Sequence, residues 1–518
     1  MKIDGKDIEV REGDTVLSAA RRAGIEIPTL CYNPQVESNT SCMVCLVEDI
    51  AEGRLIPSCA ARAEEGMEIV TLNERVREAR KTALELLLSE HVGDCEAPCT
   101  RGCPAGLDIP LMIRHIEDGN MKQAFMTALN ALVFPSVLGR ICPAPCEKVC
   151  RRGQYDSAIS ILKLKRYAGD WGLEQQTSVL PEVPAATGRK VAIAGAGISG
   201  LSAAFFLRLM GHECEVLERS PQAGGTIRTG IDPAVLPERI LDNEIRRIER
   251  VGARFRMRTE LGSDVSLAGL QKEYDAVLIA AGKREDSFFR DMGLESDSRL
   301  LVDRRSGQTS MKGVFGCGAA CGSSGMAVSA VASARRAAEG INHYLSDSKG
   351  SLPGKRLDVR IGRLKEGEME ELMKGVDPSP RVEPDSEKGY SQNQATAEAA
   401  RCMHCECLDR VTCKLRNLAD EYDAVFRRRR RDERAGVEKD ISAGEIVFES
   451  GKCIKCGICV GIADDAAGRG LTFINRGMSV KVRAPFDGKF GDLPVDVLRK
   501  CAQSCPTGAI GFVGGEGI

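Results

Sequence analysis

The stretch KVAIAGAGISGLSAAFFLRLMGHECEVLE, residues 190–218, decides the fold of the centre of this chain. Its hydrophobic pattern predicts a short strand, a glycine-rich turn, an apolar helix and a second strand. Gly195 allows a tight turn, Gly197 allows a pyrophosphate to approach the backbone, and Gly200 allows close helix packing. The helix N-terminus then faces the phosphates, and Glu218 at the end of the second strand is placed to bind a ribose hydroxyl. The stretch therefore predicts a Rossmann-like dinucleotide-binding domain.

The segment Ala223-Gly224-Gly225, which follows Glu218, is characteristic of FAD-binding rather than NAD-binding versions of this fold. We therefore expect FAD to be the dinucleotide. The residues expected to contact it are Gly195, Gly197, Ile198, Ser199, Gly200, Glu218, Arg219, Gly224, Gly225 and Gly318.

Cysteine is unusually frequent, with 22 among 518 residues, and most of these cysteines lie toward the two ends of the chain. A chain of this length can bury a core without disulfides, and its N-terminus, MKIDGKDIEV, lacks the apolar stretch of a signal peptide. We therefore expect a cytoplasmic protein whose thiols are metal ligands. No apolar stretch of about 18 residues is free of charge, which predicts no membrane span. The net charge of −2 argues against a nucleic-acid partner.

Local signals at the N-terminus predict a small domain rich in β-structure. The residues around Asp4-Gly5 alternate in polarity, which predicts a tight hairpin. A helix is predicted over residues 16–23, with Asp14 or Thr15 as its N-cap.

Four cysteines follow, Cys31, Cys42, Cys45 and Cys59, with the spacing C-x10-C-x2-C-x13-C. Four thiolates on loops suit a [2Fe–2S] cluster, whose irons need soft ligands. A structural zinc site is the alternative, although such sites usually carry two CxxC pairs and only one is present here.

Residues 30–60, LCYNPQVESNTSCMVCLVEDIAEGRLIPSCA, resemble the N-terminal ferredoxin domain of the large iron–sulfur subunit of respiratory complex I and of iron-only hydrogenases. The resemblance implies a β-grasp fold. It also implies a diaphorase-type flavoprotein subunit as an electron-donating partner. A His-x3-Cys motif of the same family is matched by His91 and Cys95.

The next part resembles the cluster domain of the glutamate synthase small subunit and of dihydropyrimidine dehydrogenase. The matching motifs are C-x3-C-x3-CP beginning at Cys95, DIP beginning at Asp108, GRICPAPCEKVCRRG beginning at Gly139, and LKRYAGDW beginning at Leu164. The resemblance implies a helical domain with two [4Fe–4S] clusters. By this resemblance, the ligands of one are His91, Cys95, Cys99 and Cys150, and those of the other are Cys103, Cys142 and Cys146.

This helical pair lacks an evident eighth ligand. The family uses Gln or Glu near the position of Lys165, and a protonated lysine cannot ligate iron. His91 can ligate as a neutral imidazole, and the alternative for it is a solvated surface histidine.

The dinucleotide domain resembles that of the glutamate synthase small subunit in GIDPAVLP, residues 230–237, and in YDAVLIAAG, residues 274–282. In that family a second dinucleotide domain, for NADPH, follows. Here the closing FAD segment, residues 313–341, resumes after about 27 residues. We therefore expect no nicotinamide site. The family's closing motif is Gly-Asp where this chain has Gly318-Ala319, so a relic fold without flavin is the alternative.

Two further cysteine groups follow a polar segment rich in proline, glycine and serine, which predicts a linker. Four cysteines within 12 residues suit a [4Fe–4S] cluster, with zinc as the alternative: Cys402, Cys405, Cys407 and Cys413. The last group resembles single-cluster bacterial ferredoxins, in which a Cys-Pro supplies the fourth ligand: Cys453, Cys456, Cys459 and Cys505. Cys501 is then spare.

These motifs predict a multidomain protein of mixed α+β and α/β class. Its predicted parts are a β-grasp [2Fe–2S] ferredoxin-type domain over residues 1–75, an α-helical double-[4Fe–4S] domain over 76–185, a Rossmann-like FAD domain over 186–345, a linker with the Cys402–Cys413 cluster segment over 346–440, and a bacterial ferredoxin-like [4Fe–4S] domain over 441–518.

The expected cofactors are one [2Fe–2S] cluster, three to four [4Fe–4S] clusters and FAD. No hydrolase or transferase motif is present, so no catalytic side chain is predicted. We expect an electron-transfer subunit of a hetero-oligomeric oxidoreductase, between an NAD(P)H diaphorase and ferredoxin or a catalytic dehydrogenase or hydrogenase subunit. The alternatives are a self-sufficient NAD(P)H oxidoreductase like the glutamate synthase small subunit, and a non-catalytic iron–sulfur scaffold with an empty dinucleotide fold.

Overall fold

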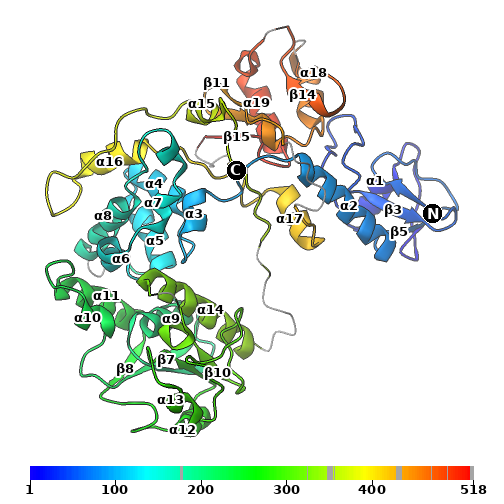
Figure 1. The fold of residues 1–518 in the computed structure, drawn as a ribbon. Coiled ribbons are helices and arrows are strands. Elements are labelled where there is room, and N and C mark those ends of the chain that lie inside the picture. Colours follow the sequence, from blue (N-terminus) through cyan, green and yellow to red (C-terminus); the bar gives the residue numbers. More distant parts are fainter. Residues whose placement is uncertain are drawn as a thin grey trace. The chain divides into compact units, whose positions relative to one another are not determined.

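The computed structural model describes residues 1–175, 179–323, 325–346, 354, 356–426, 434–467, 470–486 and 488–513, without the side chains of residues 465–467 and 478. Part of the predicted linker, residues 347–353 and 355, lies outside the described residues. The chain divides into two compact units (Figure 1). Unit 1 contains residues 1–97, 355–376 and 405–518, and unit 2 contains residues 98–354 and 377–404.

The centre of unit 2 is a parallel sheet in the order β10-β9-β6-β7-β8. Its strands are β6 (Lys190–Ala194), β7 (Glu213–Glu218), β8 (Arg254–Met257), β9 (Ala276–Ile279) and β10 (Val314–Gly316). The two strands predicted from residues 190–218 are confirmed as β6 and β7. The predicted helix between them is α9 (Ile198–Leu209), and Gly197 is its N-cap.

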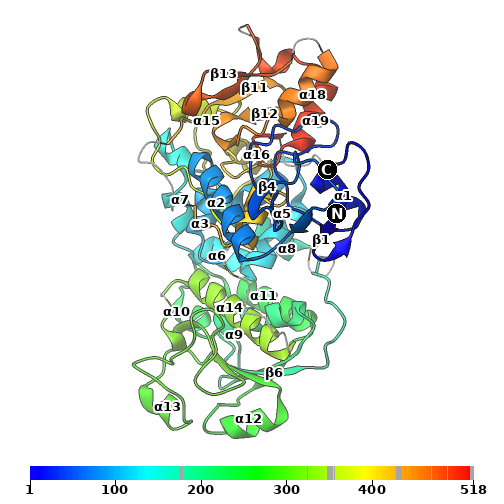
Figure 2. The ribbon, with the colours of Figure 1, turned by 90° about the vertical axis from the view of Figure 1, so that its right-hand side faces the viewer.

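Helices cover both faces of this sheet. Figures 1 and 2 show α9 (Ile198–Leu209), α11 (Glu238–Arg250) and α14 (Ala327–Leu345) on one side, and α12 (Leu267–Glu273) and α13 (Asp286–Arg290) on the other. Successive side chains of β6 point to opposite faces of the sheet, as in any strand. Val191 and Ile193 belong to the core that contains α9 and α14, whereas Ala192 and Ala194 belong to the core that contains α12.

The rest of unit 2 is helical. Its helices are α3 (Pro98–Gly102), α4 (Ile109–Glu117), α5 (Met121–Leu132), α6 (Pro135–Ile141), α7 (Pro145–Lys148), α8 (Ile161–Glu174) and α16 (Gln392–Ala400), and α10 (Thr226–Gly230) follows β7. Within the described residues, no single helix is long and apolar enough to cross a membrane. Helices α5 and α6 meet that criterion only when joined, and they are bent by 75°.

Unit 1 begins with a mixed five-stranded sheet in the order β2-β1-β5-β3-β4. The strands are β1 (Lys2–Ile3), β2 (Lys6–Asp7), β3 (Leu46–Asp49), β4 (Arg54–Pro57) and β5 (Glu68–Val70). The predicted hairpin is confirmed, because Asp4 and Gly5 both have positive φ between β1 and β2. The predicted helix is also confirmed as α1 (Val16–Arg22), whose N-cap Thr15 accepts a hydrogen bond from Ser18 N–H at 3.1 Å.

The C-terminal segment of unit 1 folds around short strands and two helices. An antiparallel sheet contains β11 (Lys439–Ala443), β12 (Ile446–Glu449) and β15 (Ile510–Phe512), a two-stranded ladder contains β13 (Thr472–Ile474) and β14 (Lys481–Arg483), and the helices are α18 (Ile458–Ala467) and α19 (Val495–Ser504). Helices α2 (Glu74–Glu90), α15 (Glu368–Met373) and α17 (Lys414–Glu421) complete the unit. One core joins its distant segments, since Cys31, Leu84, Leu415 and Ile446 all belong to it.

In unit 2, one buried carboxylate joins the helical part to the dinucleotide part. Glu244 of α11 accepts hydrogen bonds from the backbone N–H groups of Ser136 and Val137, each at 3.0 Å, at the start of α6. Its only other close ionic partner among the described residues is Arg247, at 3.7 Å. The carboxylate thus replaces a helix cap for α6, whose own N-cap residue makes no side-chain hydrogen bond.

We expect Glu244→Ala to lower the free energy of unfolding by about 2 kcal/mol, because it leaves two buried N–H groups without acceptors. Glu244→Gln keeps one acceptor oxygen and should lose less. The measurement is the thermal unfolding transition by calorimetry. Glu249→Ala, an exposed position on the same helix, is the control and should leave the transition unchanged. A Glu244→Ala protein as stable as this control would contradict the proposed capping role.

Candidate iron–sulfur and flavin sites

The four N-terminal cysteines form one buried group in unit 1. The thiol of Cys42 beside Cys31 lowers the pKa of Cys31, and the thiol of Cys45 beside Cys59 lowers the pKa of Cys59. The two pairs also interact with each other, because Cys42 acts on Cys45 and Cys31 acts on Cys59. Val44 N–H donates to Cys42 Sγ at 3.5 Å, the kind of contact that tunes an iron–sulfur cluster. This donor set fits a [2Fe–2S] cluster.

Five C-terminal cysteines line one largely apolar cavity in unit 1. They are Cys453, Cys456, Cys459, Cys501 and Cys505. Lys455 N–H donates to Cys453 Sγ at 3.3 Å, and Cys501 Sγ lies 3.7 Å from the carbonyl oxygen of Cys459. Burial raises the pKa of Cys501 to about 12. The cavity therefore offers one thiol more than the four that a [4Fe–4S] cluster uses.

The N-terminal and C-terminal cysteine groups are neighbours within unit 1. Asn39 Nδ2 donates to the carbonyl oxygen of Cys456 at 3.4 Å, and Asn33 Nδ2 donates to Ser504 Oγ at 3.3 Å. Cys31 also contributes electrostatically to the raised pKa of Cys456, after burial and the nearer cysteines. Two cysteine groups at opposite ends of the sequence thus meet in one unit.

A third group in unit 1 joins cysteines that the sequence assigned to different clusters. Cys407 N–H donates to the carbonyl oxygen of Cys95 at 3.3 Å. The thiols of Cys95 and Cys407 both act electrostatically on Cys413, whose pKa burial raises to about 12. Their predicted partners Cys99, Cys150 and Cys402 fall in unit 2.

His91 is buried at the end of α2 and is not the solvated surface histidine of the alternative interpretation. Its Nδ1 lies 3.0 Å from the carbonyl oxygen of Lys452, which favours a proton on Nδ1 and leaves Nε2 as the free lone pair. Burial, with the nearby Lys452 charge, lowers the pKa of His91 to about 4, so the ring is neutral at pH 7. Ligation of iron by His91 stays a prediction.

In unit 2, the predicted triad Cys103, Cys142 and Cys146 comes together. Burial raises the pKa of Cys146 to about 12, and the charge of Lys165 opposes this shift. Lys165 is itself buried, with 4% of its surface exposed. The lysine thus lies beside the triad, at the place where the sequence offered no fourth ligand.

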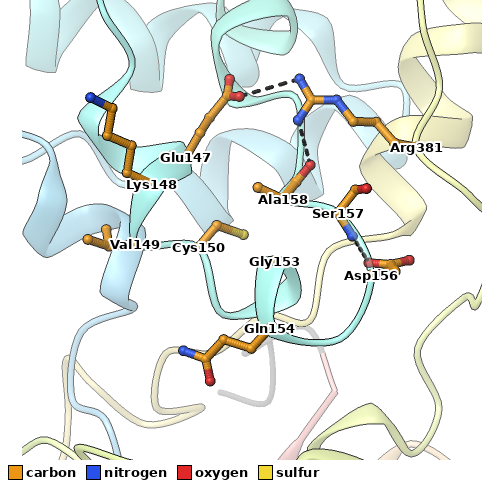
Figure 3. Close-up of a pocket in the computed structure, with 10 residues that line it drawn as sticks. All are labelled: Glu147, Lys148, Val149, Cys150, Gly153, Gln154, Asp156, Ser157, Ala158 and Arg381. Carbon is orange, nitrogen blue, oxygen red and sulfur yellow. Dashed lines mark hydrogen bonds and ion pairs between the residues drawn. The ribbon is translucent and has the colours of Figure 1, made fainter.

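Three further cysteines belong to unit 2. Cys99, Cys150 and Cys402 all pack against the same core. Cys150 also lines a pocket of about 530 Å³, and Figure 3 shows its side chain pointing into that space. Arg381 closes one side, donating to Ala158 O at 2.8 Å and to Glu147 at 3.4 Å (Figure 3). Among all described residues, no three His, Cys, Asp or Glu side chains converge on a point that could hold a single metal ion.

The glycine turn of the dinucleotide domain has the predicted form. A Cβ on Gly200 would lie 1.9 Å from the carbonyl oxygen of Gly195, and one on Gly195 would lie 2.5 Å from that of Ala280, so neither position accepts a side chain. A Cβ on Gly197 would meet nothing within 4 Å. The backbone at Gly197 therefore faces open space at the N-terminus of α9, where phosphates can approach.

Glu218 lies beside this turn, and its carboxylate is largely buried. It accepts hydrogen bonds from Ala196 N–H at 2.7 Å and from Ser220 N–H at 2.8 Å. These bonds hold the carboxylate in the position expected for ribose recognition. The turn and Glu218 fit a dinucleotide such as FAD.

The other predicted flavin contacts surround the same turn, apart from one arginine. Ser199 adjoins Gly318, where a Cβ would lie 2.1 Å from Ser199 Oγ, and Gly318 N–H donates to Ser333 Oγ at 3.0 Å. Gly224 N–H donates to Ala196 O at 2.8 Å, which fixes the Gly224-Gly225 turn beside Gly197. Arg219 is exposed and pairs with Glu260 at 3.6 Å. Ala319, at the position of the family's aspartate, is exposed and offers no carboxylate.

The structure also identifies charged residues near the thiols that the sequence motifs did not indicate. Lys452 and Arg416 lie near Cys407 and Cys95 in unit 1. In unit 2, Arg335 of α14 lies near Cys103 and donates to Ala131 O at 3.0 Å. Arg335 thereby joins the closing helix of the dinucleotide domain to the helical cysteine group. These residues carry no motif, and only the fold brings them to the thiols.

Three family models match successive parts of the chain. Residues 1–74 match a 2Fe-2S iron-sulfur cluster binding domain, residues 60–177 match dihydropyrimidine dehydrogenase domain II with its 4Fe-4S cluster, and residues 164–335 match pyridine nucleotide-disulphide oxidoreductase. Residues 1–335 are therefore built from iron–sulfur and FAD-type oxidoreductase domains.

Several curated proteins are similar to part of this chain. The beta subunit of an NADP(+)-dependent formate dehydrogenase from Moorella thermoacetica is 37% identical over 37% of this chain and 30% of its own length. The PreT subunit of a Salmonella typhimurium NAD-dependent dihydropyrimidine dehydrogenase is 39% identical over 36% of this chain and 46% of its own. The NADPH glutamate synthase small chain of Bacillus subtilis is 36% identical over 38% and 39%.

These matches confirm the resemblance to the glutamate synthase small subunit and to dihydropyrimidine dehydrogenase. The chain spans between about a third and a half of the length of these relatives. Together with the three family models, they make this chain an oxidoreductase-type protein of iron–sulfur and flavin domains.

We expect Gly200→Ala to lose flavin and to lower the thermal midpoint, because its Cβ would collide with backbone. Gly197→Ala should keep the midpoint but lower flavin content, since its Cβ enters only the space that the phosphates need. Released flavin per chain, by fluorescence, is the measurement. Gly354→Ala, in open space, is the control. Full flavin occupancy in the Gly197→Ala protein would contradict binding at this turn.

In the C-terminal cavity, Cys505→Ala should lose about four irons per chain, whereas Cys501→Ala should lose none. The reason is that Cys505, in its Cys-Pro motif, is the expected fourth ligand. Iron analysis of anaerobically purified protein is the measurement. Iron loss in the Cys501→Ala protein alone would assign the ligand to Cys501 instead.

Proposed function

We propose that this chain is an iron–sulfur flavoprotein electron-transfer subunit of a multisubunit oxidoreductase. Its proposed partners are a diaphorase-type flavoprotein subunit that handles NAD(P)H, and ferredoxin or a catalytic dehydrogenase or hydrogenase subunit. Its proposed parts are a β-grasp [2Fe–2S] domain, a helical double-[4Fe–4S] domain, an FAD domain and a bacterial ferredoxin-like C-terminal domain. The names of the relatives support this, since two of them are subunits of dehydrogenases.

The observation that carries the proposal is the contact between the N-terminal and C-terminal cysteine groups in unit 1. A cluster supplies one-electron chemistry, and the protein supplies its position and environment. The hydrogen bond from Asn39 to Cys456 O, at 3.4 Å, fixes the two ligand loops against each other. A protein that only stored iron would have no need to hold two cluster sites of different type in contact.

The buried surroundings of these thiols support the same role. Cys31, Cys42 and Cys456 are each less than a tenth exposed. Burial excludes water from the sites and fixes the ligands, which are two of the means by which a protein tunes a cluster. FAD, when bound, adds a centre that exchanges either one or two electrons. Gly197 and Glu218 would hold its pyrophosphate and ribose.

We expect no second dinucleotide domain in this chain, because the interval between β9 and β10 is short. The described structure has α13 and turns in this interval. We therefore infer that reducing equivalents from NAD(P)H enter through a partner subunit, and that the chain is inactive with NAD(P)H by itself.

We expect NADH or NADPH to leave the visible absorbance of the anaerobically purified chain unchanged, and to bleach it once the diaphorase partner is present. Full bleaching of the chain alone would instead support a self-sufficient NAD(P)H oxidoreductase. The iron content should be about 14 to 18 per chain, for four to five clusters, with one FAD. Iron at that level without any flavin would support the scaffold alternative.

A further inference from the structure

Cys95 and the segment that carries Cys405, Cys407 and Cys413 lie far apart in the sequence but belong to unit 1. We propose that these four cysteines together hold one [4Fe–4S] cluster. This ligand set differs from both sets predicted from the sequence, which placed Cys95 with His91, Cys99 and Cys150, and the other three with Cys402. The proposal concerns a metal site and does not depend on the partners of the chain.

Backbone hydrogen bonds fix Cys95 beside Cys407. Cys95 N–H donates to Val359 O at 3.1 Å, and Val359 N–H donates back to Cys95 Sγ at 3.4 Å. Cys407 N–H donates to Cys95 O at 3.3 Å. Cys95 is thus held between two other segments of unit 1, and an N–H group already points at its sulfur, as is common around iron–sulfur clusters.

The thiols of Cys407 and Cys413 face one short loop. Cys413 Sγ lies 3.8 Å from Pro506 O, and Cys407 Sγ lies 3.9 Å from Thr507 O. At Gly508 a Cβ would lie 3.1 Å from Cys407 Sγ, so the residue after Thr507 must be small for the loop to approach this closely. Both cysteines are less than a tenth exposed, as is Cys95.

Among the four cysteines of the segment at residues 402–413, the division between the two units favours Cys405 over Cys402 as the fourth ligand. Cys405 is on the unit 1 side, and it acts electrostatically on the half-buried Lys439 of β11. Cys402 is on the unit 2 side and packs against the core of that unit. A cubane takes one thiolate on each of four irons, so its ligands surround a volume and do not converge on one point.

Buried cations beside these thiols suit the negative charge of a cluster with four thiolate ligands. Lys452 and Arg416 each have 5% of the side chain exposed. Lys452 interacts electrostatically with Cys407, and Arg416 does so with Cys95. Arg416 is held by a bond to Leu357 O at 2.7 Å and by its ion pair with Glu96 at 2.9 Å. Burying such cations is favourable only opposite negative charge.

The position of this group has a direct consequence. Pro506 and Thr507 directly follow Cys505, which belongs to the C-terminal group. The new site therefore adjoins the C-terminal site through the loop that begins at Cys505, and the C-terminal site adjoins the N-terminal one through Asn39. Unit 1 then contains three cluster sites in a row.

Iron counting in single and double variants of the full chain tests the ligand set. Cys95→Ala and Cys407→Ala should each lose about four irons per chain, and the double variant should lose no more than either single one. The losses do not add, because either substitution alone already removes the one cluster that both residues bind. A double variant that loses about eight irons would overturn the proposal, because the two cysteines would then serve different clusters.

Cys402→Ala is the matched control on the same segment. If it loses iron, the loss should add to that of Cys407→Ala in the double variant, and if it loses none, the double should equal Cys407→Ala alone. A loss of about four irons in each single variant and again in the double would place Cys402 in this cluster and overturn the proposal.

Cys95→Ala and Cys413→Ala should likewise lose about four irons per chain each, and no more together. This second pair keeps the test valid if Cys407→Ala does not fold. Every variant is compared at wild-type flavin content and wild-type circular dichroism, which shows that unit 2 is intact. The electron paramagnetic resonance signal of the reduced [2Fe–2S] cluster reports whether unit 1 is folded.

Discussion

The burial of the cysteine thiols is the constraint on which unit 1 depends. Burial raises the pKa of Cys95 to about 11 and the pKa values of Cys413 and Cys456 to about 12. A ligand to iron is a thiolate, so each of these groups must lose its proton in surroundings that oppose the charge. The positive charge of the metal stabilises the buried thiolates, so the free energy of metal binding adds to the stability of the folded unit. Strands of two to five residues would form a weak framework without that contribution.

Unit 2 is built on a different principle. Its parallel sheet is buried on both faces under helices. Val191 and Ile193 of β6 belong to the core on one face, and Ala192 and Ala194 belong to the core on the other. Apolar area stabilises this part without any ligand. The cysteines of the helical part lie at the edge of an apolar core that includes Phe125 and Leu138. The dinucleotide domain can thus lose a flavin contact such as the family's aspartate, replaced here by Ala319, and still keep its fold.

The sequence predicted elements whose determinants are local. Thr15 caps α1, and Asp4-Gly5 forms the hairpin. Strands β6 and β7 lie where the hydrophobic pattern predicted them. It also predicted that the four N-terminal cysteines form one group, because all four come from one short stretch. It did not predict that Cys95 lies against Cys407, because the contact depends on Val359 and on the loop after Cys505, and spacing within a motif carries no information about a distant segment. Buried His91 and Lys165 show the same limit, since their burial comes from neighbours that no motif encodes.

The interleaving of the two units has a consequence for how the chain is made. Unit 1 takes its first segment from residues 1–97 and its last from residues 405–518, and Cys31 and Cys42 share a core with Leu415 and Ile510. Ribosomes add about 5–20 residues per second, so the N-terminal segment waits on the order of tens of seconds for the segment that completes its core. Unit 2, most of which is continuous over residues 98–354, can fold during that interval. The sheet of residues 2–70 has its own core and can form early, whereas Cys31 and Cys42 gain their C-terminal core partners only when synthesis is nearly complete.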